Sequence, residues 1–381
     1  MLAWRSEPFR IFFPLAVLLA WVGIGHWLLY ALGVTSAYSC LFHGLVQMQA
    51  FMMAFAVGFL LTALPRRTQT AAVSIGEMMA MAAALIVTAG AAMAELWVVA
   101  EVAYGLLFVL LFQFAFRRFL GRQAGRRPPA AFVLIPIGVA HGIAGATLIA
   151  ASVLRDRSVW MMGFGRLLVE QGVFLCFAVG VGSLVLPLMS GGPPPPDIGA
   201  SPRERWRALA YVILGSAIFA SLVLEQAGWP RGGALLRAAV VALGLGLGAG
   251  AWRPPGKPGL HRRMVWLSVW LMPIGLAVSG LWPDYRVPAL HILFIGGFAM
   301  MAFGVATHVA FSHLGLEQLA LGRPLAVAVL GGALLLALLA RLAADVSETY
   351  FVHLGWAAAV WLLGSAVWLA FLGPKLLRRS S

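Results

Sequence analysis

The sequence has little charge and few cysteines. Only 10% of its 381 residues are charged, whereas 62% are hydrophobic, and the mean hydropathy is +0.93. Soluble domains contain about 25% charged residues, so a water-soluble fold is excluded. The two cysteines, Cys40 and Cys176, are expected at different helix depths, which argues against a disulfide. Cys40 and His43 form a C-x-x-H pair without the second cysteine of a c-type attachment motif, so covalent haem is not expected.

Acidic residues are scarcer than basic ones. The chain has 13 Asp and Glu against 27 Lys and Arg, which gives a net charge of +14. In a soluble protein this excess would suggest a nucleic-acid partner. Here the basic residues lie in short loops between apolar runs, where they orient a membrane protein. We therefore expect the lipid bilayer, and no nucleic acid, as the partner.

Long apolar runs fill most of the chain. At about 20 apolar residues per crossing, they predict twelve transmembrane helices. The expected ranges are 11–32, 38–64, 71–92, 95–116, 129–153, 160–189, 208–228, 232–252, 262–282, 287–312, 323–343 and 350–373. Continuous apolar runs favour helices over a barrel, so the expected fold class is an all-α polytopic integral membrane protein. The connections near 93 and 230 are so short that merged or re-entrant pairs are an alternative there.

Loop charge predicts the orientation. One set of loops, together with both termini, carries twenty basic residues: Arg5, Arg10, Arg66, Arg67, Arg117, Arg118, Arg122, Arg126, Arg127, Arg203, Arg205, Arg207, Arg253, Lys257, Arg262, Arg263, Arg323, Lys375, Arg378 and Arg379. The opposite ends carry five: Arg155, Arg157, Arg231, Arg286 and Arg341. By the positive-inside rule, both termini face the cytoplasm of a bacterial inner membrane.

A proline-rich stretch divides the chain. The whole sequence, 1–381, is expected to form a single transmembrane domain with halves 1–190 and 208–381. Four consecutive prolines favour an extended polyproline geometry, so 191–207 is predicted to be a stiff cytoplasmic linker between the halves.

Two helices share a histidine-containing repeat. His43 precedes Met-Met-Ala-Phe at 52–55, and His291 precedes the same four residues at 300–303, with an offset of 248 throughout. Both helices run from outside to inside, so the two histidines are expected at one depth. A shorter match, Phe-Ala-Val-Gly at 55–58 and 177–180, hints at a threefold repeat of four helices.

Neutral histidine is a ligand for haem iron, and histidine inside a membrane tends to mark function. We therefore predict a haem b held by His43 and His291 near the periplasmic face. The alternative is that each histidine makes an interhelical hydrogen bond. His26 and His353, at similar depth, are candidates for a second metal or for hydrogen bonds to a haem propionate.

Arginines in the outer halves of the helices are candidates to bind the propionates. These are Arg166, Arg237 and Arg341. Interhelical ion pairs are the alternative for each, and the i,i+4 spacing of Arg166 and Glu170 predicts such a pair. Methionines at helical spacing in the second and third helices raise the possibility of copper, although methionine in this pattern usually packs.

The remaining histidines are not predicted to bind the haem. His141 is expected to pack near the midplane, with a proton relay as the alternative. His308 and His313 lie too far along their helix to share a metal with His291. His261 is expected in a loop, exposed to solvent.

Three segments resemble the NnrS family: "RSEPFRIFFPLA", "HGLVQMQAFMMAFAVGFLLTALPRRT" and "ALHILFIGGFAMMAFGVATHVAFSHLG". The resemblance implies a haem- and copper-containing membrane protein linked to nitric oxide metabolism and resistance. Where the family has an H-x-H-E-M run, this chain keeps only the first histidine, His43. His291 and His313 also match, whereas His308 replaces a usual arginine, so the chain looks like a divergent branch.

The layout is also similar to the catalytic subunit of haem-copper oxidases and nitric oxide reductases. Helices 6 and 7 lack the histidines of a binuclear centre, so gas reduction at such a centre is not expected. We expect a haem protein that carries electrons or binds nitric oxide or another diatomic ligand, with enzymatic activity and redox partner left open. The alternatives are a twelve-helix secondary transporter without haem, and an assembly partner of a reductase.

Overall fold

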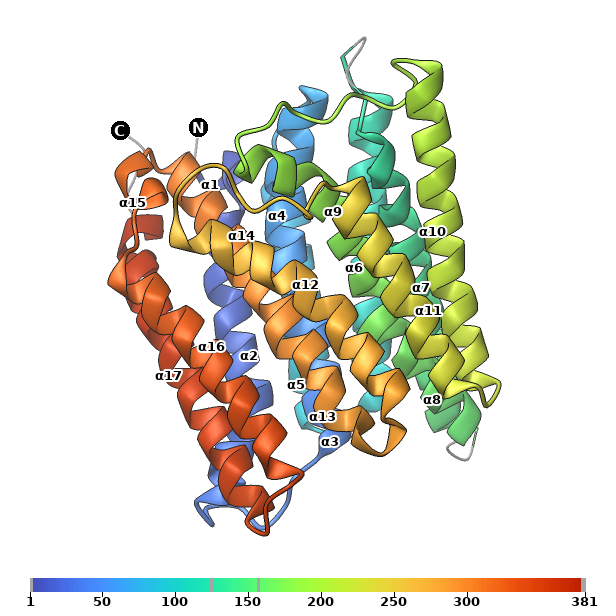
Figure 1. The fold of residues 1–381 in the computed structure, drawn as a ribbon, viewed down its shortest axis with the longest axis vertical. Helices are drawn as coiled ribbons and strands as arrows, with labels where there is room; N and C mark the ends of the chain where they lie inside the picture. The colour runs from blue at the N-terminus through green and yellow to red at the C-terminus, as the bar shows by residue number, and fades with distance from the viewer. Residues whose placement is uncertain (1–2, 124–126, 156–157, 378–381) are drawn as a thin grey trace.

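Twelve apolar helices of membrane length lie side by side in the computed structural model, which describes residues 3–123, 127–155 and 158–377 (Figure 1). In chain order the crossings are α2 (Phe9–Ala31); α3, η1 and α4 (Cys40–Val46, Gln47–Met52, Met53–Thr68); α5 (Ile75–Met93); α6 (Trp97–Leu120); η2 and α7 (Ala130–Val133, Leu134–Leu154); α8, η3 and α9 (Val159–Leu167, Leu168–Gly172, Val173–Met189); α10 (Pro202–Gln226); α11 and η4 (Pro230–Ala242, Leu243–Gly248); α12 (Leu260–Leu281); η5, α13, η6 and α14 (Pro283–Tyr285, Arg286–His291, Ile292–Ala299, Met300–His313); α16 (Leu325–Ala344); and α17 (Tyr350–Leu377). Two short helices, α1 (Ala3–Ser6) and α15 (Glu317–Leu321), lie outside the crossings.

Each predicted range overlaps one of these crossings, and the described residues form no β-strand. The predicted all-α polytopic fold is therefore confirmed. The short connections are tight turns between separate crossings, in which Glu95 and Gly228 adopt positive φ angles of 58° and 93°. The merged alternative is wrong at both places.

Both ends of the chain lie at one end of the bundle, as an even number of crossings requires (Figure 1). We call this the terminal end. The opposite end, where α3 and α13 begin, is called the far end. His43 and His291 belong to α3 and α13, so both histidines lie toward the far end, as their shared register predicted.

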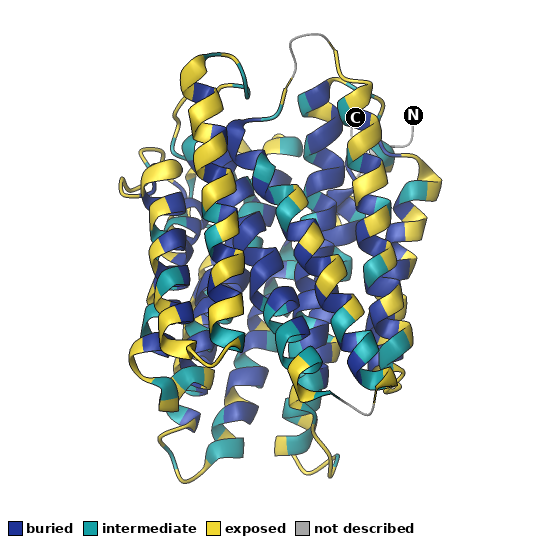
Figure 2. Ribbon diagram, turned by 90° about the vertical axis from the view of Figure 1, so that its right-hand side faces the viewer, coloured by how far each residue is buried: buried dark blue, intermediate teal, exposed yellow. Residues whose placement is uncertain are grey.

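Three crossings form the centre of the bundle. The second, sixth and tenth have 78%, 78% and 67% of their apolar windows buried, against at most 56% for any other crossing. Figure 2 shows that buried residues, in dark blue, fill the interior of the bundle, whereas the outer helices carry most of the exposed residues, in yellow. These three crossings share a second feature, an internal π-helical segment: η1, η3 and η6. This common architecture supports the predicted equivalence of helices 2, 6 and 10.

The linker between the halves is shorter than predicted. The seventh crossing begins at Pro202, inside the expected 191–207 linker, because Ser201 caps the helix by accepting a hydrogen bond from Glu204 N at 3.3 Å. Proline is favoured at this first helical position. Asp197 anchors the linker through an ion pair with Arg67 and a 2.9 Å hydrogen bond from Arg127 N. The linker is thus pinned to neighbouring loops.

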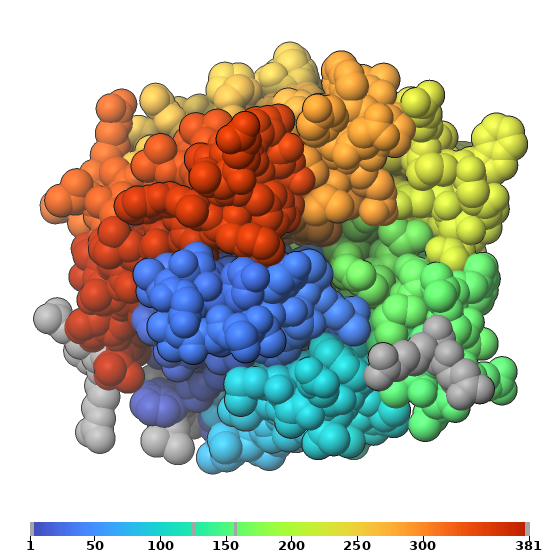
Figure 3. All heavy atoms as spheres, turned by 90° about the horizontal axis from the view of Figure 1, so that it is seen from below, coloured from blue at the N-terminus to red at the C-terminus, as the bar shows by residue number. Residues whose placement is uncertain are grey.

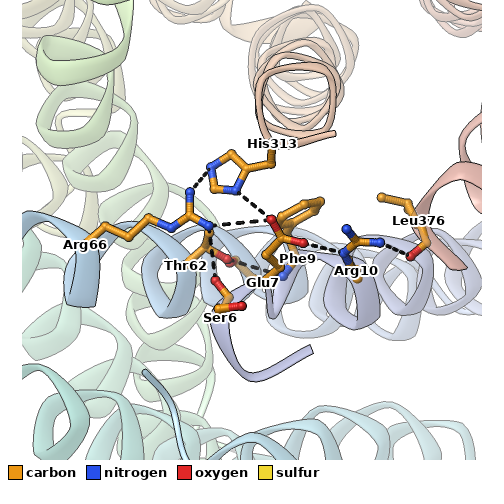
Figure 4. A network of polar contacts seen from close by, with 9 residues as sticks. Ser6, Glu7, Phe9, Arg10, Thr62, Arg66, His313 and Leu376 are labelled. Carbon is orange, nitrogen blue, oxygen red and sulfur yellow. Dashed lines mark hydrogen bonds and ion pairs between the residues drawn. The ribbon is translucent and has the colours of Figure 1, made fainter. Parts of the chain in front are cut away.

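A polar network closes the terminal end (Figure 4). The Glu7 carboxylate pairs with Arg10 at 2.6 Å and lies 3.6 Å from both Arg66 Nη2 and His313 Nδ1. Arg66 Nη1 donates to His313 Nε2 at 3.0 Å, and Arg10 Nη1 donates to the Leu376 carbonyl at 2.8 Å. Contacts from four crossings meet here, the first, second, tenth and last. His313 therefore has a structural role far from His291.

Candidate functional site

A cavity of about 400 Å³ lies among the first, second, sixth, tenth, eleventh and last crossings. This volume is within the range of small-molecule sites. Both His43 and His291 line the cavity, and its other charged side chains are Arg166, Glu170, Arg286 and Arg341. Apolar side chains make up most of the rest of the lining: Ile24, Trp27, Met48, Phe51, Met52, Val287, Leu290, Phe294, Ile295, Ala299, Leu354, Ala357, Ala358 and Trp361.

Aromatic residues join the elements beside the cavity. Figure 3 looks onto the far end, where the blue segment around residues 30–40 lies against the red-orange start of the last crossing. Phe351 contacts the rings of Tyr30 and Tyr38, with centroids 4.8 and 5.2 Å apart, and Tyr38 packs on Trp27. These contacts hold the last crossing against the first crossing and against the segment that leads into α3. His43 belongs to α3.

The two cavity histidines are held in the same way. His43 Nδ1 lies 2.9 Å from the Gly23 carbonyl of the first crossing, and His291 Nδ1 lies 2.8 Å from the Val287 carbonyl one turn earlier. A carbonyl oxygen only accepts, so in each neutral ring Nδ1 carries the hydrogen and Nε2 carries the lone pair. Among the described residues neither Nε2 has a hydrogen-bond partner. Both imidazoles therefore present a free lone pair, the form that binds a metal.

His26 packs against His43 and is not among the residues that line the cavity. Its Nδ1 contacts the same Gly23 carbonyl at 3.0 Å, and its ring centroid is 6.0 Å from that of His43. His26 Nε2 is buried without a partner in the described part of the chain. His353, half-buried on the last crossing, is also absent from the described residues that line the cavity. The structure thus brings His43 and His291 to one cavity, and does not bring His26 or His353 there.

The cavity arginines already have carboxylate partners. Arg166 Nε donates to Glu170 Oε1 at 2.8 Å, which is the predicted i,i+4 pair, and Arg341 pairs with Asp345. A guanidinium has five N–H donors, so each arginine keeps donors for a further anion.

Arg237 lies outside the cavity. It is 1% exposed and pairs with Glu225, and its Nε and Nη1 have no partner in the described residues. Glu225 also pairs with Arg286, which does line the cavity. The sequence reasoning counted Arg286 only as a loop charge, although its position five residues before His291 was a usable signal.

The remaining histidines do not share this cavity. His141 stacks on Phe219 with centroids 5.6 Å apart and lies 3.9 Å from the Cys176 sulfur, in agreement with the packing interpretation.

The expectation for His261 was wrong. This residue is 0% exposed, and its Nε2 lies 3.2 Å from His308 Nδ1. The helix begins at Leu260, two residues before the predicted start at 262, because Gly259 has a φ of 131° that ends the preceding loop. His261 therefore belongs to the first turn of a packed helix.

A protein-only metal site is not evident. Within the described ranges, no three His, Cys, Asp or Glu side chains are grouped so that they could hold a metal ion. A haem differs in its requirement, because the macrocycle supplies the equatorial nitrogens and the protein supplies only the axial ligands. Two histidines on one cavity therefore fit a haem better than a bare ion.

Comparison with known proteins identifies the family of this chain. A search of curated proteins found no significant relative. The model of the family described as NnrS protein matches residues 3–380, which is nearly the whole chain. The chain therefore belongs to the NnrS family.

Proposed function

We propose that this membrane protein of the nitric oxide response binds one haem b, with His43 and His291 as its axial ligands. One observation carries the proposal: two imidazoles on the same cavity, each with Nδ1 at a backbone carbonyl and a free Nε2. Fixing Nδ1–H on a carbonyl is the usual way in which a metal-binding histidine is oriented. Family membership supports the link to nitric oxide.

The alternative role of the two histidines as interhelical packing groups is less well supported. His291 bonds within its own helix, to Val287, so it ties no helices together. His43 does bond to the first crossing, but through Nδ1 only. In both rings Nε2 has no hydrogen-bond partner among the described residues, which packing does not explain.

The lining suits the rest of a haem. Its apolar and aromatic side chains match the macrocycle, and Arg166, Arg286 and Arg341 offer charge-assisted donors to propionates. Arg237 would act on such carboxylates only indirectly, through Glu225. When bound, the haem iron supplies one-electron redox chemistry, and with two axial histidines electron transfer is favoured over binding of a diatomic ligand.

Soft sulfur donors also border the cavity. These are Cys40, Met48 and Met52. Thiol and thioether ligands suit Cu(I), so copper is a second metal to measure in the purified protein.

The test is a reduced-minus-oxidised visible spectrum of the full chain in detergent, with haem and copper content determined on the same sample. We expect a low-spin haem b in the wild type. His43→Ala and His291→Ala should each lose the haem or leave it five-coordinate, seen as a high-spin spectrum with new affinity for carbon monoxide. His308→Ala is the matched control, because this histidine lies on the same crossing as His291 and pairs with His261 instead.

The other function classes predict different results. A wild type without haem would contradict the proposal and favour a secondary transporter. Metal-free protein that co-purifies with a reductase would favour an assembly role. Fully occupied low-spin haem in both histidine variants would place the haem elsewhere.

A further inference from the structure

Glu101 is a buried acid with an unusual partner. It is 1% exposed on α6, and Gln49 Nε2, itself 1% exposed in the π segment η1, lies 2.9 and 2.8 Å from its two carboxylate oxygens. The other buried or half-buried acids in the described residues each form an ion pair with arginine: these are Glu7, Glu77, Glu170, Asp197, Glu204 and Glu225. Glu101 has only a neutral amide.

No cation faces Glu101 from the neighbouring elements. The elements packed most extensively against α6 are α4, α5 and α7, and η1, which has no charged residue, contacts α6 through Gln49. Their described charged or titratable side chains are Arg66 and Arg67 of α4, Glu77 of α5 and His141 of α7. The arginines lie at the terminal end, Glu77 pairs with Arg118, and His141 packs with Phe219 and Cys176.

On α6 itself, Tyr104 is the titratable group nearest to Glu101 in the sequence; the other two, Arg117 and Arg118, lie in the last turn of the helix, at the terminal end. Tyr104, one turn further along α6, is 0% exposed, and its hydroxyl has no hydrogen-bond partner in the described part of the chain. It lies within electrostatic reach of Glu101. A phenol is neutral and cannot compensate a carboxylate charge. Among the described residues, the polar groups identified around Glu101 are therefore the neutral Gln49 amide and the neutral Tyr104 hydroxyl.

We infer that Glu101 is an intramembrane proton-binding site, occupied by one proton at neutral pH. A carboxylate buried without a cation is costly, and such groups neutralise instead. A neutral carboxyl keeps a hydrogen bond with Gln49, because the amide Nε2 can donate to its C=O oxygen. Glu101 is the fifth residue of α6, so it lies only about 6 Å along the helix from its far-end start. Protons therefore have a short path from that side.

The site borders the cavity through one element. Gln49 belongs to η1, in which Met48, Phe51 and Met52 line the cavity. The π segment thus turns its glutamine toward α6 while its neighbours face the proposed haem site. The proton site itself does not depend on the haem, and its test does not use the haem.

The experiment is infrared spectroscopy of the full chain in liposomes at neutral pH. Exposed carboxyl groups are ionised there, so a carboxylic-acid C=O band reports a protonated buried acid. We expect one such band in the wild type, a shift of that band in heavy water, and its complete loss in Glu101→Gln, a nearly isosteric change. Glu77→Gln is the matched control and should leave the band, because Arg118 holds Glu77 as a carboxylate at 2.6 and 2.9 Å.

Two further results bear on the inference. Glu101→Asp should keep a band at a shifted frequency, which covers the case in which Glu101→Gln does not fold. A wild type without the band, a band that does not shift in heavy water, or a band that survives in Glu101→Gln would overturn the inference.

Discussion

The proposed haem site depends on a single backbone group, the carbonyl of Gly23. It accepts from His43 and lies 3.0 Å from His26 Nδ1, so one oxygen orients both imidazoles of the first two crossings. The close approach of these helices needs a residue without a side chain. A Cβ at Gly23 would lie 2.2 Å from Gln47 Nε2 and 3.1 Å from a Val46 methyl group.

Gly23→Ala should therefore displace the Gln47 amide from the Ala20 carbonyl, which it now reaches at 3.0 Å. The loss of one such hydrogen bond costs about 0.5–1.5 kcal/mol, and we expect a lower Tm and weaker retention of haem. Gly25→Ala is the control, because nothing lies within 4 Å of a Cβ there. Equal Tm and haem content in the two variants would show that this close approach is unimportant.

The arginines differ in their positions, so their substitutions should differ in effect. Arg166 and Arg341 line the cavity, and Arg237 does not. Removal of a positive charge beside a haem disfavours the added electron, so Arg166→Leu or Arg341→Leu should make the midpoint potential more negative. Arg237→Leu should instead lower Tm, because it leaves Glu225 with Arg286 alone. A redox titration and a melting curve of each variant distinguish these effects; unchanged potentials for both cavity arginines would mean that they are structural.

For the helices as elements, the sequence predicted their positions along the chain better than the local geometry within each helix. Apolar runs of about 20 residues reveal crossings because hydrocarbon demands them. The π segments η1, η3 and η6 leave no such trace, since one extra residue in a turn changes neither composition nor length noticeably. The Ser201-Pro202 start was a readable capping signal that was missed, and His261 was misplaced because its helix began earlier than its apolar run.

The same limit applies to the site. The depth of His43 and His291 followed from register and loop charge, and both residues do line one cavity. Which arginines reach that cavity depends on helix rotation, which hydropathy cannot give. Glu101 likewise could not be singled out from the sequence, because its partner, which is Gln49 and not an arginine, depends on how the helices pack.

In the whole molecule, the two ends of the helix bundle carry different features. Cavity-lining residues such as His43, Arg286 and Tyr350 belong to the far-end parts of their crossings, while the linker and both termini lie at the terminal end (Figure 1). The excess of basic residues in the loops at the terminal end predicts that this end faces the cytoplasm. A haem in the cavity would then exchange electrons near the periplasmic face, and Glu101 would take its proton from that side.

Reporter fusions test this orientation directly. A fusion after residue 381 and one in the linker near Pro195 should report cytoplasm, whereas one at Asp284, exposed in the far-end loop before His291, should report periplasm. The linker and the loop sit at opposite ends of the bundle, so the two internal fusions must disagree whatever the orientation is. A phosphatase and a fluorescent reporter at each position provide opposite signals and guard against poor expression. If Asp284 reported cytoplasm while the linker reported periplasm, the fold would stand, but the proposed haem and the proton path of Glu101 would face the cell interior.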